Sequence, residues 1–137
     1  MVRACLIAPI AAAGTLLAGC GGSGGTRLTA GQLAAQGAAI CSQASAAERT
    51  LTASNAASAL PPIVTRELAA LRKLSPPLSE QRSYAALIDD FSQLNGLLQQ
   101  LSPSTASPEV LSRGRELAAR GAALARELGL AACTSPQ

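Results

Sequence analysis

Histidine and tryptophan are absent from this chain of 137 residues, and tyrosine, phenylalanine and methionine occur once each. The single methionine is Met1, so the rest of the chain lacks both usual haem ligands, His and Met. A zinc site would have to use cysteines and carboxylates without an imidazole. One phenylalanine and one tyrosine provide no stacking platform, and a formal net charge of +3 is too weak to indicate nucleic-acid binding.

Few residues could carry catalysis, and each has a structural explanation. Asp89 and Asp90 are adjacent, so on a helix they point about 100° apart, which favours a solvated face over a paired active site. Lys73 has Ser75 and Ser79 nearby, but it ends a short helix, and a Ser/Lys dyad is not favoured. We therefore predict no enzyme activity, no cofactor, and no catalytic, cofactor-binding or metal-ligating residue.

The first 20 residues have the parts of an export signal. Arg3 is the only charge among them, and an uncharged, mostly apolar stretch of 14 residues runs from Ala4 to Leu17. At about 1.5 Å per residue, such a helix is shorter than a hydrocarbon core of roughly 30 Å. We therefore do not expect this stretch to persist as a transmembrane anchor.

Leu17-Ala18-Gly19-Cys20 resembles the lipobox of bacterial lipoproteins. The resemblance implies removal of the signal peptide 1–19, attachment of lipid such as palmitate to Cys20, and anchoring at the extracytoplasmic side of the cell membrane. The alternatives are an ordinary secretory signal and a chance apolar start. Residues 20–28 are then the lipidated cysteine and a flexible Gly/Ser tether, and residues 29–137 form the domain.

Two cysteines remain in the predicted domain, Cys41 and Cys133. Outside the reducing cytoplasm, two such cysteines are expected to form a disulfide. Closing the long loop between them contributes on the order of 4–5 kcal/mol in the chain-entropy account. The alternative is a reactive or metal-binding thiol, but no histidine is present to activate one.

Proline positions and apolar spacing predict two helices in the first half of the domain. The first covers Thr29–Ser58, starts with the capping-box spacing of Thr29 and Gln32, and is ended by Leu60-Pro61-Pro62, with fraying or a bend expected after Leu51. The second covers Ile63–Leu74. The residues expected to face the core are Leu33, Gly37, Ile40, Ala44, Ala47 and Leu51, then Val64, Leu68 and Leu71.

Two more helices are predicted in the second half. The third covers Ser79–Leu101 and is closed by Ser102-Pro103, and the fourth starts with Ser107-Pro108-Glu109 and ends at Gly129. The apolar positions of both helices follow heptad spacing. The apolar seam of the third helix could also form a dimer interface. The seam residues are Tyr84, Leu87, Phe91, Leu94, Leu98 and Leu101, then Val110, Gly114, Leu117, Gly121, Leu124 and Leu128.

Several side chains have specific expected roles in this packing. Gly114 and Gly121 are predicted to mark close helix crossings, with Gly37 facing them. Tyr84 is expected at the core edge with its hydroxyl in water, rather than against a ligand. Charged pairs of i, i+4 spacing are expected between Glu109 and Arg113 and between Glu116 and Arg120.

The fold class that follows is all-α: an antiparallel up-down four-helix bundle stapled by the Cys41–Cys133 disulfide. In this topology the start of the first helix and the end of the fourth share one end of the molecule. The disulfide therefore requires only a short return of the chain after Gly129.

The Leu71–Pro77 turn and the Glu127–Cys133 segment are similar to those of small Ala/Leu/Arg-rich lipoproteins of high-GC bacteria. The resemblance implies localisation and helical architecture, and no catalytic residues. We expect a membrane-anchored, non-catalytic interaction or structural module with an envelope protein as partner. The alternative is a binding module that holds a small apolar ligand or lipid in the bundle core.

Overall fold

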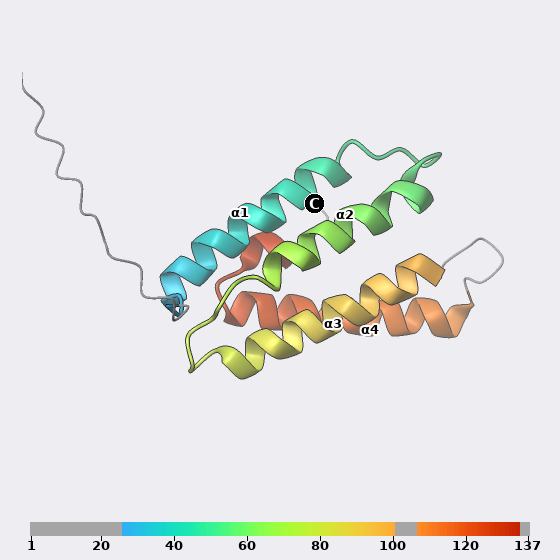
Figure 1. The fold of residues 1–137 in the computed structure, drawn as a ribbon. Coiled ribbons are helices and arrows are strands. Elements are labelled where there is room, and N and C mark those ends of the chain that lie inside the picture. Colours follow the sequence, from blue (N-terminus) through green and yellow to red (C-terminus); the bar gives the residue numbers. More distant parts are fainter. Residues whose placement is uncertain (1–25, 101–106, 135–137) are drawn as a thin grey trace, which may run out of the picture.

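The computed structural model describes residues 26–100 and 107–134. It contains α1 (Ala30–Glu48), α2 (Ala56–Leu71), α3 (Gln81–Gln100), α4 (Pro108–Glu127) and a short 3-10 helix, η1 (Ala131–Thr134). The predicted all-α fold of four helices is confirmed, and successive α-helices run in alternating directions (Figure 1), as in an up-down arrangement. The predicted signal peptide, Cys20, most of the tether, Leu101 and Ser102-Pro103 lie outside the described residues.

The first helix begins as predicted but ends earlier. Gln32 N donates to Thr29 Oγ1 at 3.2 Å, and Thr29 N donates to Gln32 Oε1 at 2.9 Å, which completes the capping box. The expected extension to Ser58 is wrong, because α1 stops at Glu48. In the turn that follows, Thr52 N donates to Asn55 Oδ1 at 2.7 Å, so a side chain replaces the helical backbone acceptor.

The Pro61-Pro62 pair lies inside α2 and does not end a helix, so the predicted boundary is wrong here too. The helix starts at Ala56, and the prolines occupy its second turn. Proline has a helical φ, and its missing N–H leaves free the carbonyls four residues earlier, on Ala57 and Ser58. Both residues are exposed, so water can satisfy these carbonyls.

The fourth helix has the predicted ends, and its C-terminus reverses the chain. Ser107 accepts from Val110 N at 3.3 Å as N-cap, and Pro108 is the first helical residue. Gly129 has a φ of 70°, a conformation that favours glycine. Gly129 N donates to Arg126 O at 3.1 Å and Leu130 N to Ala125 O at 2.7 Å, which is a Schellman motif.

The reversed chain closes the bundle between α1 and α4. Among the described residues, no Cα atom of α1 lies within 8 Å of one in α4, whereas η1 approaches both helices. Leu130 is fully buried and fills the space beside Gly37. Cys133 is bonded to Cys41 with a Cα–Cα distance of 4.9 Å, so the predicted disulfide is present. No pattern in the sequence predicted η1.

The core is concentrated at the end of the bundle that η1 closes. Tyr84 is buried there, and its hydroxyl donates to Leu71 O at 2.7 Å, not to water as expected. Burial raises the pKa of Tyr84 to about 12. Within the described residues, no helix is both long and apolar enough to cross a bilayer. The buried cluster consists of Leu33, Tyr84, Leu87, Ala125, Leu128 and Leu130.

An ion pair between the buried Asp90 and the exposed Arg120 joins α3 to α4, and the expectation of a solvated Asp90 is wrong. Asp89 is exposed, but Asp90 is only 3% exposed, and it accepts two hydrogen bonds from Arg120, one of them 2.7 Å from Nε to Oδ2. The predicted Glu116–Arg120 and Glu109–Arg113 pairs are replaced. Arg120 pairs with Asp90, and Arg113 lies 3.6 Å from Glu116.

The glycines differ from each other in their surroundings. Gly121 is a close crossing as predicted, since a Cβ there would lie 2.9 Å from Phe91 Cε1. Gly114 is not, because the nearest side-chain atom to a Cβ would be Leu94 Cδ1 at 4.0 Å. Gly37 faces Leu130 and not the α4 glycines. The Leu130 side chain therefore occupies the space beside Gly37 where a second helix was expected.

Gly37→Ala and Gly114→Ala form a matched pair of tests for this packing. Both remove a helical glycine, which alone stabilises a helix by about 1 kcal/mol. At Gly37 the new Cβ would overlap Leu130 Cδ2, so we expect a net loss of about 1–2 kcal/mol. At Gly114 we expect a gain of about 0.5–1 kcal/mol. Urea unfolding measures both, and equal effects would contradict the account.

Asp90→Ala and Asp89→Ala test the link between α3 and α4. Asp90→Ala removes a charge-assisted acceptor of two hydrogen bonds and is expected to cost about 2 kcal/mol. Asp89→Ala changes an exposed side chain, and we expect less than about 0.5 kcal/mol. Denaturant unfolding of the two variants side by side gives the comparison. A loss of the same size in both would show that Asp90 is not a structural link.

Candidate functional site

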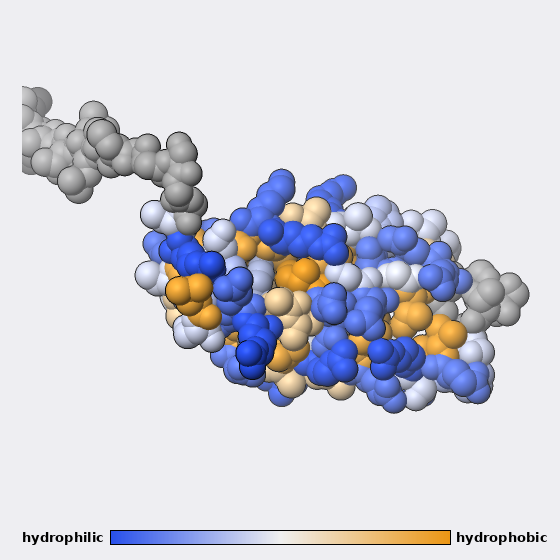
Figure 2. Space-filling model, turned by 60° about the horizontal axis from the view of Figure 1, so that its bottom comes forward, coloured by the Kyte–Doolittle hydropathy of each residue, from blue (hydrophilic) through white to orange (hydrophobic). Residues whose placement is uncertain are grey.

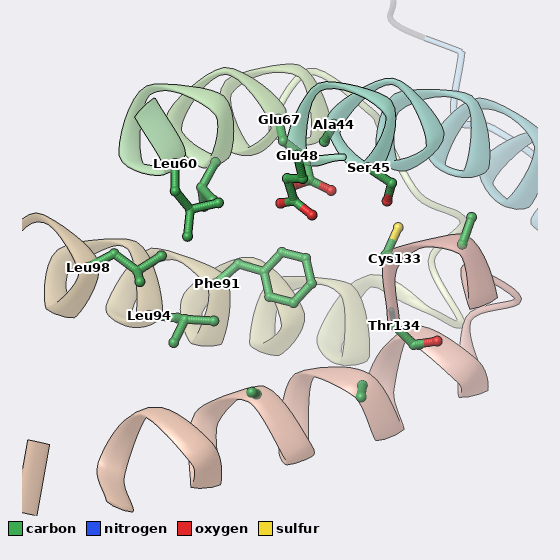
Figure 3. A pocket seen from close by; sticks show the side chains of 14 residues that line it. Ala44, Ser45, Glu48, Leu60, Glu67, Phe91, Leu94, Leu98, Cys133 and Thr134 are labelled. Atoms are coloured by element: carbon green, nitrogen blue, oxygen red, sulfur yellow. The ribbon is translucent and has the colours of Figure 1, made fainter. Parts of the chain in front are cut away.

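A cavity of about 460 Å³ lies between the α1–α2 pair and the α3–α4 pair, next to η1 (Figure 3). Each of these five elements contributes to its wall. It exists because α4 presents only the small side chains of Ala118 and Ala122, while η1 takes the place of a direct contact between α1 and α4. Its volume is within the roughly 300–1,000 Å³ range of ligand pockets.

Most of the cavity wall is apolar. Leu60, Leu94 and Leu98 lie together at the end away from η1 in Figure 3, and the Phe91 ring lies between them and the disulfide. These four side chains are only partly buried, so the cavity is open to solvent along part of its length. The remaining apolar members are Ala44, Val64, Ala118, Ala122 and Ala132.

Two carboxylates enter the cavity from its upper wall. Figure 3 shows the side chains of Glu48, from the end of α1, and Glu67, from α2, hanging side by side above the Phe91 ring. Both are partly buried. Neither carboxylate has an ion-pair or hydrogen-bond partner among the described residues. The lining includes no lysine or arginine, so the charge in the cavity is wholly negative when both groups are ionised.

The position of Glu67 raises its pKa from the ordinary value of 4.5 to about 7. Loss of hydration is the larger cause, because burial disfavours the charged carboxylate. Repulsion by Glu48 is the smaller cause. Glu67 is therefore partly protonated near neutral pH, and a positive charge placed beside it would favour the ionised form.

Glu67 also lies against the disulfide. One of its carboxylate oxygens and the sulfur atoms of Cys41 and Cys133 all lie within 4.8 Å of one another. In reduced form these three groups could serve as metal ligands. In the oxidised protein the two sulfurs are bonded to each other, so the group provides no thiolate.

Of the candidate site residues that lie in the described part of the chain, the structure brings together one pair, Cys41 and Cys133. Lys73, Ser75 and Ser79 are exposed after the end of α2. Asp90 is used in the ion pair with Arg120, while Asp89 faces solvent.

Sequence reasoning missed Glu48 and Glu67, although a signal was present. Glu48 follows Ala44 by four residues, and Glu67 lies three residues after Val64 and four before Leu71. Each acid therefore falls within the apolar stripe of its own helix, where an unpaired charge is costly. An acid at such a position points to a ligand or a partner.

Comparison with protein-family models, with curated proteins and with solved structures finds no match to this chain.

Glu67→Gln is expected to flatten the pH dependence of stability. Since the folded-state pKa of Glu67 is raised from 4.5 to about 7, the native state holds this proton more tightly than the unfolded chain. Stability from this group is complete below pH 4.5 and is lost as pH rises through 7. The loss is on the order of 2 kcal/mol, at about 1.4 kcal/mol per pKa unit with allowance for partial solvation.

Urea unfolding between pH 4.5 and 8 measures this effect. Glu67→Gln should lose less stability than the wild type over that range, and Glu116→Gln, an exposed acid, should follow the wild type. Identical profiles for Glu67→Gln and the wild type would show that Glu67 is not desolvated.

Proposed function

We propose that the protein is a non-catalytic binding module that holds a small apolar molecule in the cavity among its helices. The cavity is the observation that supports this function, because a wall of leucine, alanine and phenylalanine side chains offers apolar surface that is only partly covered. Burying apolar surface contributes about 25 cal/mol per Å². A ligand with an alkyl chain would gain this free energy on entering.

The N-terminal sequence supports a location for this activity. The lipobox-like Leu17-Ala18-Gly19-Cys20 and the Gly/Ser tether favour a domain held near the extracytoplasmic face of a bacterial membrane by lipid on Cys20. Such anchoring would keep the cavity close to a source of apolar molecules.

A helix-face interaction with an envelope protein is the other function that the sequence favours. Its structural support is weaker. The exposed large apolar side chains among the described residues are Leu78, in the loop before α3, and Leu111, on α4, at 71% and 46% exposure. On the face shown in Figure 2, apolar side chains lie in small patches separated by hydrophilic ones. Single exposed leucines are ordinary on protein surfaces.

Ala122→Phe and Ala123→Phe test the proposed function. Ala122 lines the cavity, while the next residue on the same helix, Ala123, is exposed. The full chain, exported and processed by a bacterial host, would be placed in phosphatidylcholine nanodiscs and titrated with octan-1-ol by calorimetry. Empty nanodiscs serve as the blank. We expect Ala122→Phe to weaken binding about tenfold or more by filling the cavity, and Ala123→Phe to bind like the wild type.

Circular dichroism of both variants checks that the helices are retained. No binding of octan-1-ol by the wild type, or an equal loss in the two variants, would contradict the function.

A further inference from the structure

The cavity is amphipathic along its length, and this polarity carries information about the ligand beyond its apolar character. The end away from η1 is formed by leucines, whereas Glu48, Glu67, Ser45 and Thr134 lie toward η1 and the disulfide (Figure 3). A ligand that matches this wall has an alkyl chain at one end and a polar head group at the other.

The charge of the wall selects the sign of that head group. Glu48 and Glu67 are the charged residues of the lining, and neither has a cationic partner among the described residues. An anionic head would be repelled by both carboxylates, and a neutral head would leave them unpaired in an apolar setting. A protonated amine supplies hydrogen-bond donors and a compensating charge at once. The hydroxyl groups of Ser45 and Thr134 can accept from it as well.

The size of the cavity limits the apolar part. A volume of about 460 Å³ is in the lower half of the usual range for ligand pockets. This size fits one short alkyl chain better than the paired acyl chains of a phospholipid. The phosphate of an ordinary membrane lipid would also bring negative charge toward Glu48 and Glu67.

We infer that the ligand is a single-chain amphiphile with a protonated amine, with its alkyl chain against Leu60, Leu94 and Leu98 and its ammonium group at the Glu67 carboxylate. This inference rests on the proposed function, since it assigns the class of molecule that the cavity holds. Glu67 is the main contact because its carboxylate lies against the disulfide, on the side of the cavity away from Leu60 and Leu98 (Figure 3). Glu48 adds to the negative field beside it.

Three ligands with the same alkyl chain test the inference: octylamine, octan-1-ol and octanoate. Each is titrated at pH 8 into the full chain in phosphatidylcholine nanodiscs, with empty nanodiscs as the blank. Glu67 is then mostly ionised, because its pKa is about 7. We expect octylamine to bind about tenfold more tightly than octan-1-ol, and octanoate about tenfold more weakly.

The variants Glu67→Gln and Glu116→Gln identify the contact. Glu67→Gln should lose the preference for the amine and keep the binding of octan-1-ol. Glu116→Gln changes an acid on the exposed face of α4 and should keep the preference. If Glu67→Gln keeps the preference for the amine, the assignment of the head group to Glu67 is overturned. The same holds if the variant loses the binding of octan-1-ol together with the preference.

The outcomes separate this inference from the proposed function. If octan-1-ol binds as tightly as octylamine, the proposed binding of apolar molecules is retained and the inferred amine head group is wrong. If none of the three binds, the proposed function itself fails. Tighter binding of dihexanoyl phosphatidylethanolamine than of octylamine would overturn the single-chain ligand and assign the site to a lipid head group.

Discussion

The bundle depends on the contact that the returning C-terminal segment makes with α1. The backbones of α1 and α4 do not approach each other, so the fourth side of the bundle is closed by η1 alone among the described elements. Gly129 reverses the chain, Leu130 fills the space beside Gly37, and the Cys41–Cys133 disulfide fixes the result. A disulfide that closes so long a loop stabilises the fold chiefly by restricting the unfolded chain. These contacts of the C-terminal segment with α1 are local, and they leave the rest of the fourth side of the bundle open.

The cavity is the consequence of that incomplete closure. Beyond η1, the alanines of α4 are too small to reach α1 and α2, and the leucines of α2 and α3 stay partly uncovered. The acids Glu48 and Glu67 lie at the junction of the closed and open parts, where burial raises the pKa of Glu67 and no described residue pairs with either carboxylate. If positions 48 and 67 contributed to stability alone, apolar side chains would be expected there. Their presence is the reason to assign the cavity a ligand with a positive head group.

The parts of the fold that could be predicted from sequence depend on local signals. The Thr29 and Ser107 caps, the Gly129 ending and the disulfide each follow from residue types within a few positions or from the cysteine count. The predicted α1–α2 boundary was wrong because the prolines near the start of α2 were interpreted as the end of the first helix. Asp90 and Gly37 were assigned incorrectly because their partners, Arg120 and Leu130, are distant in sequence. An apolar site in the bundle core was predicted only as the alternative function, and its position could not be predicted, since it depends on the separation of α1 from α4.

The most direct test of the account is to locate octylamine in the protein by isotope-filtered NMR, with the full chain labelled and held in phosphatidylcholine nanodiscs. We expect nuclear Overhauser contacts from the alkyl chain to Phe91, Leu94 and Leu98, and from the methylene next to the nitrogen to Glu67. Contacts confined to surface residues, or the same contacts in the cavity-filling Ala122→Phe variant, would contradict it.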